Sequence, residues 1–194
     1  MLSFGKRIYR KSKKILFYYL NRSKFKFLSK TATFVSPIRF DGKDGIQIGD
    51  NSFIQSGAWL YCCGVDGLNA NLSIGSNCEF GYNNHIASIQ SVIIGDFVLT
   101  ANNVYISDNI HEYLDVNKPI IRQSIRFKGA VNIGDGAWIG ENVCIIGASI
   151  GKNSVIGANS VVTRDVPDFS VAVGSPARVI RRFDAELQKW VDCK

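Results

Sequence analysis

The sequence predicts an all-β solenoid built from six-residue repeats. From residue 48 onwards an aliphatic residue recurs at intervals of six, and glycine followed by a polar residue commonly comes next. A period of six matches neither the 3.6-residue period of a helix nor the alternation of an ordinary strand. Sequence self-similarity at a fixed period indicates stacked units that bury their apolar faces only against one another.

Three hexads would close one triangular coil, each supplying a short strand and a corner. The aliphatic residue is expected to point to the axis, and Gly, Asp and Asn to occupy corners where unusual backbone angles cost them least. A β-sandwich would place its turns about 8–12 residues apart, which argues against that alternative. The predicted coils begin at Ile48, Ile74, Ile94, Ile133, Ile150 and Val173.

Two insertions interrupt the repeat. The longer one, residues 107–132, is expected to protrude as a loop, and a loop of this length in a regular solenoid is typically functional. The shorter one covers residues 62–72. The predicted organisation is therefore a basic, aromatic-rich helical arm over 1–40, a solenoid over 41–182 and a C-terminal helix over 183–194. Phe183, Leu187, Trp190 and Val191 recur at helical spacing, and Asp184 is a candidate N-cap.

Charge is distributed unevenly along the chain. Residues 1–30 contain ten of the 23 Lys and Arg residues and none of the 16 acidic ones, so the remaining 13 basic residues leave a net charge of −3 over 31–194. This distribution argues against a nucleic-acid-binding body. Two roles for the arm remain open: it covers the end of the solenoid, or it contacts an anionic membrane through residues 1–30.

The composition also limits the cellular context. The longest strongly apolar run, residues 15–20, is far shorter than the roughly 20 residues of a spanning helix. The basic N-terminus lacks the apolar core of a secretory signal. Five cysteines without a metal-binding spacing fit a reducing compartment, so a cytoplasmic protein without a metal is expected.

Three segments carry a resemblance to the hexapeptide-repeat acyltransferases, which covers about residues 40–182. One runs from Ile94-Gly-Asp to Ser-Asp-Asn-Ile-His111, and another is Val131-Asn-Ile-Gly-Asp-Gly-Ala-Trp-Ile-Gly140. The third joins Ile156-Gly-Ala-Asn-Ser-Val-Val-Thr-Arg-Asp-Val-Pro167 to Val173-Gly-Ser-Pro-Ala-Arg-Val-Ile-Arg181. They are most similar to the sugar O-acetyltransferases of maltose, galactoside, nodulation-factor and surface-polysaccharide type.

The resemblance implies a left-handed parallel β-helix that works as a homotrimer and takes acetyl-CoA as acyl donor. It implies that His111 is the catalytic base, because it matches the family histidine before the protruding loop. Asp108 or Glu112 could orient its imidazole. A histidine of near-neutral pKa suits the removal of a hydroxyl proton.

The acceptor and donor sites are also implied by the resemblance. Asn83 resembles the asparagine that contacts the acceptor sugar; Asn84 is its competitor under a one-residue shift, and His85 could line the same cleft. Corner residues of the solenoid would explain all three equally well. The implied contacts of the donor are Trp138, Gly140, Ala158, Ser160, Thr163, Arg164, Arg178 and Arg181.

The predicted function is therefore O-acetylation of a sugar hydroxyl in surface-polysaccharide biosynthesis (O-antigen, capsule or exopolysaccharide). An N-acyltransferase on an amino sugar or nucleotide-sugar, or a serine-type acetyltransferase, would share the fold and the histidine. A trimeric scaffold without catalysis would bind no CoA. With two histidines, a zinc-dependent hexapeptide enzyme is disfavoured.

Overall fold

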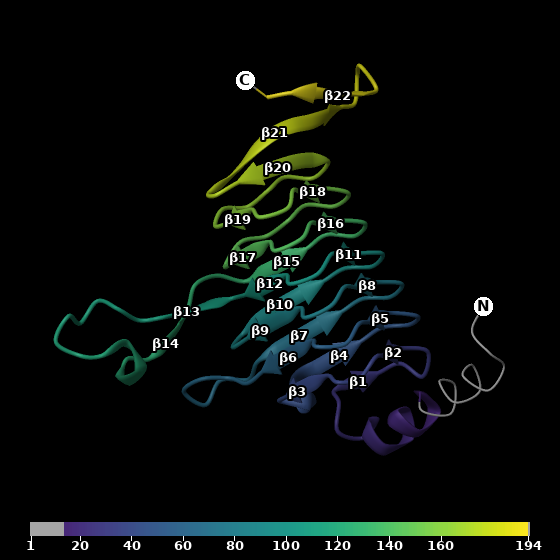
Figure 1. Ribbon diagram of the computed structural model, residues 1–194, viewed down its shortest axis with the longest axis vertical. Helices are drawn as coiled ribbons and strands as arrows, with labels where there is room; N and C mark the ends of the chain where they lie inside the picture. The colour runs from purple at the N-terminus through teal and green to yellow at the C-terminus, as the bar shows by residue number, and fades with distance from the viewer. Residues whose placement is uncertain (1–13, 194) are drawn as a thin grey trace.

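The computed structural model describes residues 14–193 as a triangular parallel β-helix (Figure 1). Three sheets form its faces, and parallel pairing between successive coils satisfies the backbone groups of each short strand, while the last two strands of the second sheet pair in antiparallel fashion. Together with the six-residue spacing, these sheets are consistent with the left-handed β-helix that the resemblance implies. The first face consists of β1 (Phe27–Leu28), β4 (Ile46–Ile48), β7 (Asn71–Ile74), β10 (Ser91–Ile94) and β15 (Val131–Ile133).

The other two faces follow the first around each coil. The second face consists of β2 (Thr33–Phe34), β5 (Phe53–Ile54), β8 (Glu79–Phe80), β11 (Leu99–Thr100), β16 (Trp138–Ile139), β18 (Val155–Ile156), β20 (Ser170–Gly174), β21 (Ala177–Asp184) and β22 (Lys189–Asp192). The third face consists of β3 (Arg39–Asp41), β6 (Trp59–Cys62), β9 (His85–Ser88), β12 (Tyr105–Ser107), β17 (Cys144–Ile146) and β19 (Val161–Val162).

The predicted aliphatic column fills the core. Ile48, Ile74 and Ile94 pair in register along the first face and are at most 2% exposed. Burying one such side chain contributes about 1.5–3 kcal/mol relative to leaving it in water. Because each coil stacks the same position on its neighbours, the column extends along the whole solenoid.

The solenoid has an additional coil at its start. Leu28, Phe34 and Phe40 are spaced by six residues, and their strands pair in parallel with the coil that begins at Ile48. The boundary predicted at residue 41 therefore lies too late. At the other end, the last coil begins at Val166, which bridges Ile150, and not at the predicted Val173. Ala172 occupies the inward position there and is fully buried.

The corners use asparagine as the prediction requires. Asn83, Asn103, Asn142 and Asn159 occupy equivalent corner positions with φ between 55° and 59°. Asparagine tolerates this left-handed region better than other side chains do. The amides also bond to one another along the axis, with Asn83 Nδ2 donating to Asn103 Oδ1 at 3.2 Å and Asn142 Nδ2 to Asn159 Oδ1 at 3.1 Å.

A short helix covers the N-terminal end of the solenoid. Residues 14–21 are helical, and the rest of the predicted arm before them lies outside the described residues. Phe17 packs on the rings of Phe34 and Phe40 with centroid distances of 4.9 and 6.1 Å. The prediction of a helical arm up to residue 40 is wrong beyond residue 21, since β1, β2 and β3 belong to the first coil.

The predicted C-terminal helix is a β-hairpin. Strands β21 and β22 pair in antiparallel fashion and place Phe183 opposite Trp190, with ring centroids 5.8 Å apart. Asp184 Oδ1 accepts the N–H groups of Glu186 and Leu187, which stabilises the turn and starts no helix. Strand β20 has no further coil above it, so β21 pairs with it and satisfies its exposed edge.

The insertion over 107–132 forms an antiparallel hairpin that projects from the side of the solenoid (Figure 1). Its strands are β13 (Asn109–His111) and β14 (Ile125–Phe127), and the short 3-10 helix η2 (Ile120–Arg122) lies between them. A second 3-10 turn, η1 (Lys43–Gly45), precedes β4. The predicted loop is therefore partly ordered by strand pairing, which fixes its root.

The ring cluster around Phe17 predicts a difference in stability between two faces of one helix. Phe17→Ala removes a partly buried ring from the end of the core, so the free energy of unfolding should fall by about 2 kcal/mol. Leu16→Ala is the matched control, because Leu16 is 60% exposed and its loss should change the free energy by less than about 0.5 kcal/mol. Denaturant unfolding measures both, and equal losses would contradict this packing.

Candidate functional site

His111 lies where the projecting hairpin leaves the solenoid. It is the last residue of β13 and pairs with Ile125 of β14, so two strands fix its backbone. Its side chain is exposed. An exposed imidazole on a strand close to its root is available to a ligand and cannot drift as it would in a free loop.

Asp108 holds the root of the hairpin and does not orient His111. Its carboxylate is fully buried and accepts N–H bonds from Ile89 at 2.9 Å and from Gln90 and Ser91 at 2.8 Å. A buried carboxylate is stabilised by several amide donors of this kind. The side chain therefore ties the departing hairpin to the corner of the preceding coil.

Glu112 is engaged by Arg126 across the hairpin, where the two side chains form an ion pair. Among the described residues, neither Glu112 nor Asp108 donates to or accepts a bond from His111. The structure thus assigns both predicted carboxylates to other partners.

His85 belongs to a column of side chains on the third face. In register, the column comprises Arg39, Trp59, His85 and Tyr105. The His85 ring stacks flat on Trp59, with centroids 4.2 Å apart and planes 4° apart, and the Arg39 guanidinium lies 4.2 Å from the centroid of Trp59. Burial, and then the charge of Arg39, lower the pKa of His85 below its ordinary value. The imidazole is therefore held neutral.

The two asparagines have different positions. Asn84 is 1% exposed, and its amide donates to Thr100 Oγ1 at 2.8 Å while its oxygen accepts from the N–H of Val104 at 2.8 Å. This corrects the prediction that its side chain contacts an acceptor, because withdrawing it would leave buried groups unpaired. Asn83 is exposed at the neighbouring corner position.

The predicted donor residues also separate into two groups. Ser160 is fully buried and donates to the carbonyl of Gly157 at 2.6 Å, and Gly140 is buried where an added Cβ would meet Ala158 N at 2.7 Å. These two positions are required by coil stacking, which corrects their assignment as ligand contacts. The exposed group consists of Trp138, Ala158, Thr163, Arg164, Arg178 and Arg181.

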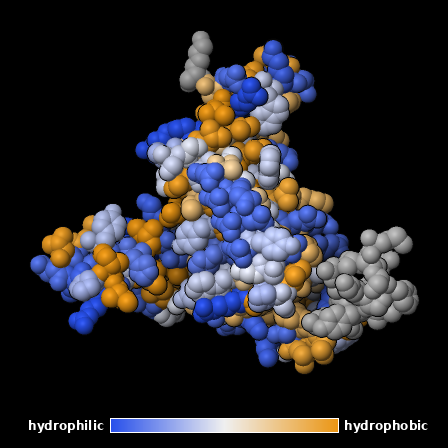
Figure 2. Space-filling view, viewed as in Figure 1, coloured by the Kyte–Doolittle hydropathy of each residue, from blue (hydrophilic) through white to orange (hydrophobic). Residues whose placement is uncertain are grey.

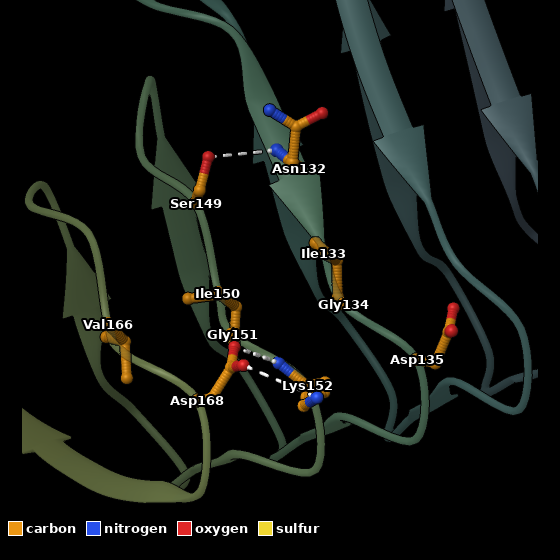
Figure 3. Close-up of a pocket in the computed structure, with 10 residues that line it drawn as sticks. All are labelled: Asn132, Ile133, Gly134, Asp135, Ser149, Ile150, Gly151, Lys152, Val166 and Asp168. Atoms are coloured by element: carbon orange, nitrogen blue, oxygen red, sulfur yellow. Dashed lines mark hydrogen bonds and ion pairs between the residues drawn. The ribbon is translucent and has the colours of Figure 1, made fainter.

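A shallow groove of about 400 Å³ crosses the upper coils (Figure 3). It lies where the first face narrows to single bridges, between Ile133, Ile150 and Val166. One of its carboxylates is bonded to a neighbouring coil, since Asp168 Oδ1 accepts the backbone N–H of Lys152 at 2.9 Å. No group of three His, Cys, Asp or Glu side chains suited to a metal ion occurs within residues 14–193.

Sequence reasoning missed both the third-face column and this groove. The column residues each directly precede the inward residue of the third hexad, as Trp59 precedes Leu60 and His85 precedes Ile86. The groove residues Asp135, Lys152 and Asp168 each follow the inward residue of the first hexad by two positions. Comparing equivalent outward positions between coils would have identified both sets.

Comparison with known proteins assigns the chain to a family. The family model described as a hexapeptide repeat of succinyl-transferase matches residues 71–108 and 130–164. A galactoside O-acetyltransferase of Lactococcus lactis is 32% identical over 147 residues, which cover 75% of this chain and 67% of that protein. The chain belongs to the hexapeptide-repeat acyltransferase family.

Other relatives of this hexapeptide-repeat protein match it over only part of their length. WbbJ of Escherichia coli K12, whose name assigns it provisionally to lipopolysaccharide biosynthesis as an O-acetyl transferase, is 41% identical over 113 residues, 55% of this chain and 58% of that protein. The chain spans 44% to 64% of the length of the first three curated relatives that it matches. AntD, an N-acyltransferase from Bacillus cereus solved with dTDP and 3-hydroxybutyryl-CoA, superimposes with a TM-score of 0.72 at 19% identity, covering 87% of this chain and 89% of that one. This last likeness concerns the fold alone.

For this hexapeptide-repeat protein, the buried carboxylate of Asp108 predicts a large stability effect. Asp108→Ala leaves the amides of Ile89, Gln90 and Ser91 without their acceptor, so the free energy of unfolding should fall by at least about 3 kcal/mol. Asp115→Ala is the control, because Asp115 pairs with Lys118 at the surface and should change it by less than about 1 kcal/mol. Denaturant titration compares the two variants, and a small loss of stability in Asp108→Ala would contradict the role of this carboxylate in holding the hairpin root.

The neutral His85 predicts a pH dependence of stability. The pKa of a histidine in the unfolded chain is about 6.5, and the pKa of His85 in the folded protein is lower. Acidification therefore protonates His85 in the unfolded state first. The contribution of neutral His85 to the free energy of unfolding is fully present above about pH 6.5. It is lost as the pH falls from there through the pKa of His85 in the folded protein. NMR should show His85 titrating below pH 6.5 in the folded protein. The free energy of unfolding should decrease between pH 7 and about 5.5, and this decrease should be smaller in His85→Phe than in the wild type. An identical decrease in the variant would contradict the prediction.

Proposed function

We propose that the protein is an acyl-CoA-dependent O-acetyltransferase acting on a sugar hydroxyl in surface-polysaccharide biosynthesis. The observation that carries the proposal is the exposed His111 on the paired root of the hairpin, at the position that matches the catalytic histidine of its family. The names of the relatives support the reaction type, since the galactoside enzyme of L. lactis and WbbJ are both named as O-acetyl transferases. The name of WbbJ, which assigns it provisionally to lipopolysaccharide biosynthesis, supports the choice of a saccharide acceptor.

In the proposed mechanism His111 accepts a proton. The bound thioester supplies an activated acyl group. The imidazole takes the proton of the acceptor hydroxyl as the hydroxyl oxygen forms the new bond to the acyl carbon, and it returns that proton to the sulfur when the carbon–sulfur bond breaks. Asn83 is the proposed acceptor contact, since it is exposed at its corner whereas Asn84 is not.

The exposed arginines suit the phosphates of the donor. Arg164 and Arg178 form no ion pair within the described residues, and Arg181 pairs with Asp192 at 2.5 Å on the C-terminal hairpin. Guanidinium groups bind phosphate oxygens through parallel N–H bonds. The residues present therefore fit an anionic donor, and Trp138, which is 50% exposed, offers an apolar wall for it. Ala158 and Thr163 complete this proposed site.

The proposed assembly is a homotrimer with each site between two subunits. Leu99 and Trp138 are 44% and 50% exposed on the second face, and Phe97 is 64% exposed at the corner before it. The hairpin tip exposes Leu114 and Val116 at 74% and 91%. Apolar surfaces of this kind are typical of subunit contacts. A trimer would bring His111 of one subunit towards the upper coils of another.

The test is release of thiol from acetyl-CoA in the presence of sugars, amino sugars and serine. We expect turnover with a sugar hydroxyl, and His111→Ala should lower kcat by about 10²–10⁴ while calorimetry shows unchanged CoA binding. Because the side chain is exposed, the variant should unfold at the same denaturant concentration as the wild type. Turnover only with an amine would identify an N-acyltransferase, and absence of CoA binding would leave the scaffold function.

A further inference from the structure

The helix over residues 14–21 has two apolar faces, and the solenoid uses only one of them. Phe17 and Tyr18 pack against the core cluster at the open end of the first coil. The opposite side exposes Ile15, Leu16, Tyr19 and Leu20, at 45%, 60%, 54% and 60%. Covering the solenoid therefore does not explain the apolar residues on the outer side of the helix.

These exposed side chains form part of a larger feature, the basal surface, at the end of the molecule opposite the C-terminal hairpin. Figure 2 shows apolar surface at this lower end, where Figure 1 places the helix. The basal surface is defined by Ile15, Leu16, Tyr19, Leu20, Arg22, Lys24 and Lys30.

Cations predominate on the basal surface, and the exposed carboxylate next to Lys30 is that of Asp50, which accepts from Ser29 Oγ and Thr31 Oγ1. Arg22, Lys24 and Lys30 are exposed, and none of them forms an ion pair within residues 14–193. The Arg22 guanidinium lies 5.5 Å from the centroid of the Tyr19 ring, so cation and apolar side chain occupy the same patch. The first 30 residues contain ten Lys and Arg and no Asp or Glu, and six of those cations lie at or before residue 14.

We infer that the basal surface docks on an anionic lipid bilayer. An amphipathic helix that combines exposed Leu, Ile and Tyr side chains with Lys and Arg binds in the interface of such a bilayer. A second copy of this chain fits less well, because two basal surfaces face to face would oppose cations of the same sign. No helix within residues 14–193 is long and apolar enough to cross a membrane. The contact inferred here is a peripheral one.

The inference goes beyond acyl transfer and rests on the proposed function only through the trimer. Three copies would present three helices at one end, and multivalent attachment strengthens a weak individual contact. Attachment in this way would place the enzyme beside acceptors carried on lipid. Vesicle binding is measured without substrate, so its failure and the failure of acyl transfer are distinguishable.

The experiment is flotation of the full chain with vesicles of phosphatidylcholine alone or mixed with phosphatidylglycerol. The wild type should float with the mixed vesicles only and be released as salt rises from about 0.05 to 0.5 M. The double variant Leu16→Glu with Leu20→Glu should weaken binding at least about tenfold, since both side chains are 60% exposed. Calorimetric CoA binding and circular dichroism check that this variant is folded.

The matched control is Leu68→Glu with Leu187→Glu. These leucines are 56% and 57% exposed on other parts of the surface, so the control adds the same charge and removes the same apolar area. It should bind vesicles nearly as well as the wild type. Absence of flotation at low salt, or equal loss in both double variants, would overturn the inference. If the wild type does not bind vesicles but self-associates through Leu16 and Leu20, the basal surface is a protein interface instead.

Discussion

Parallel stacking of equivalent coils is the constraint on which the rest of this structure depends. Each strand is two to five residues long over most of the solenoid, so no coil could satisfy its backbone or bury its inward side chains alone. Register fixes which residues share a column. The same register that aligns Ile48, Ile74 and Ile94 inside aligns Trp59, His85 and Tyr105 outside. The positions of the outward side chains therefore follow from the register of the core.

An interruption of such a stack needs its own support. The hairpin that carries His111 leaves the solenoid between β12 and β15, and its root is tied by the buried carboxylate of Asp108 to amides of the preceding coil. The ends need support too, because the first and last coils expose apolar and backbone groups. Phe17 covers one end, and strand β21 pairs with the other.

Local pattern predicted the features that repeat. The six-residue period, the asparagine corners and the position of the insertion follow from spacing alone, and His111 stands out as one of two histidines beside that insertion. Spacing predicted the wrong element at the C-terminus, where the same apolar residues suit both a helix and a hairpin. Phe183, Leu187 and Trp190 suit a helix, yet Phe183 and Trp190 are also correctly spaced to face each other across a tight turn. Only the unpaired edge of β20 decides between them.

By itself, the sequence determined the solenoid, its family and the place where the chain leaves the repeat, because these depend on periodic burial and on motif order. Tertiary structure decided which neighbouring polar residues face outward. Asn83 and Asn84 differ by one position, but the left-handed corner at Asn83 leaves its side chain at the surface and turns that of Asn84 into the coil. Asp108 likewise lies in the segment that ends at His111, so its position in the sequence suggested a role beside that histidine. Only the fold shows that its carboxylate binds amides 17 to 19 residues earlier in the chain and so supports the structure.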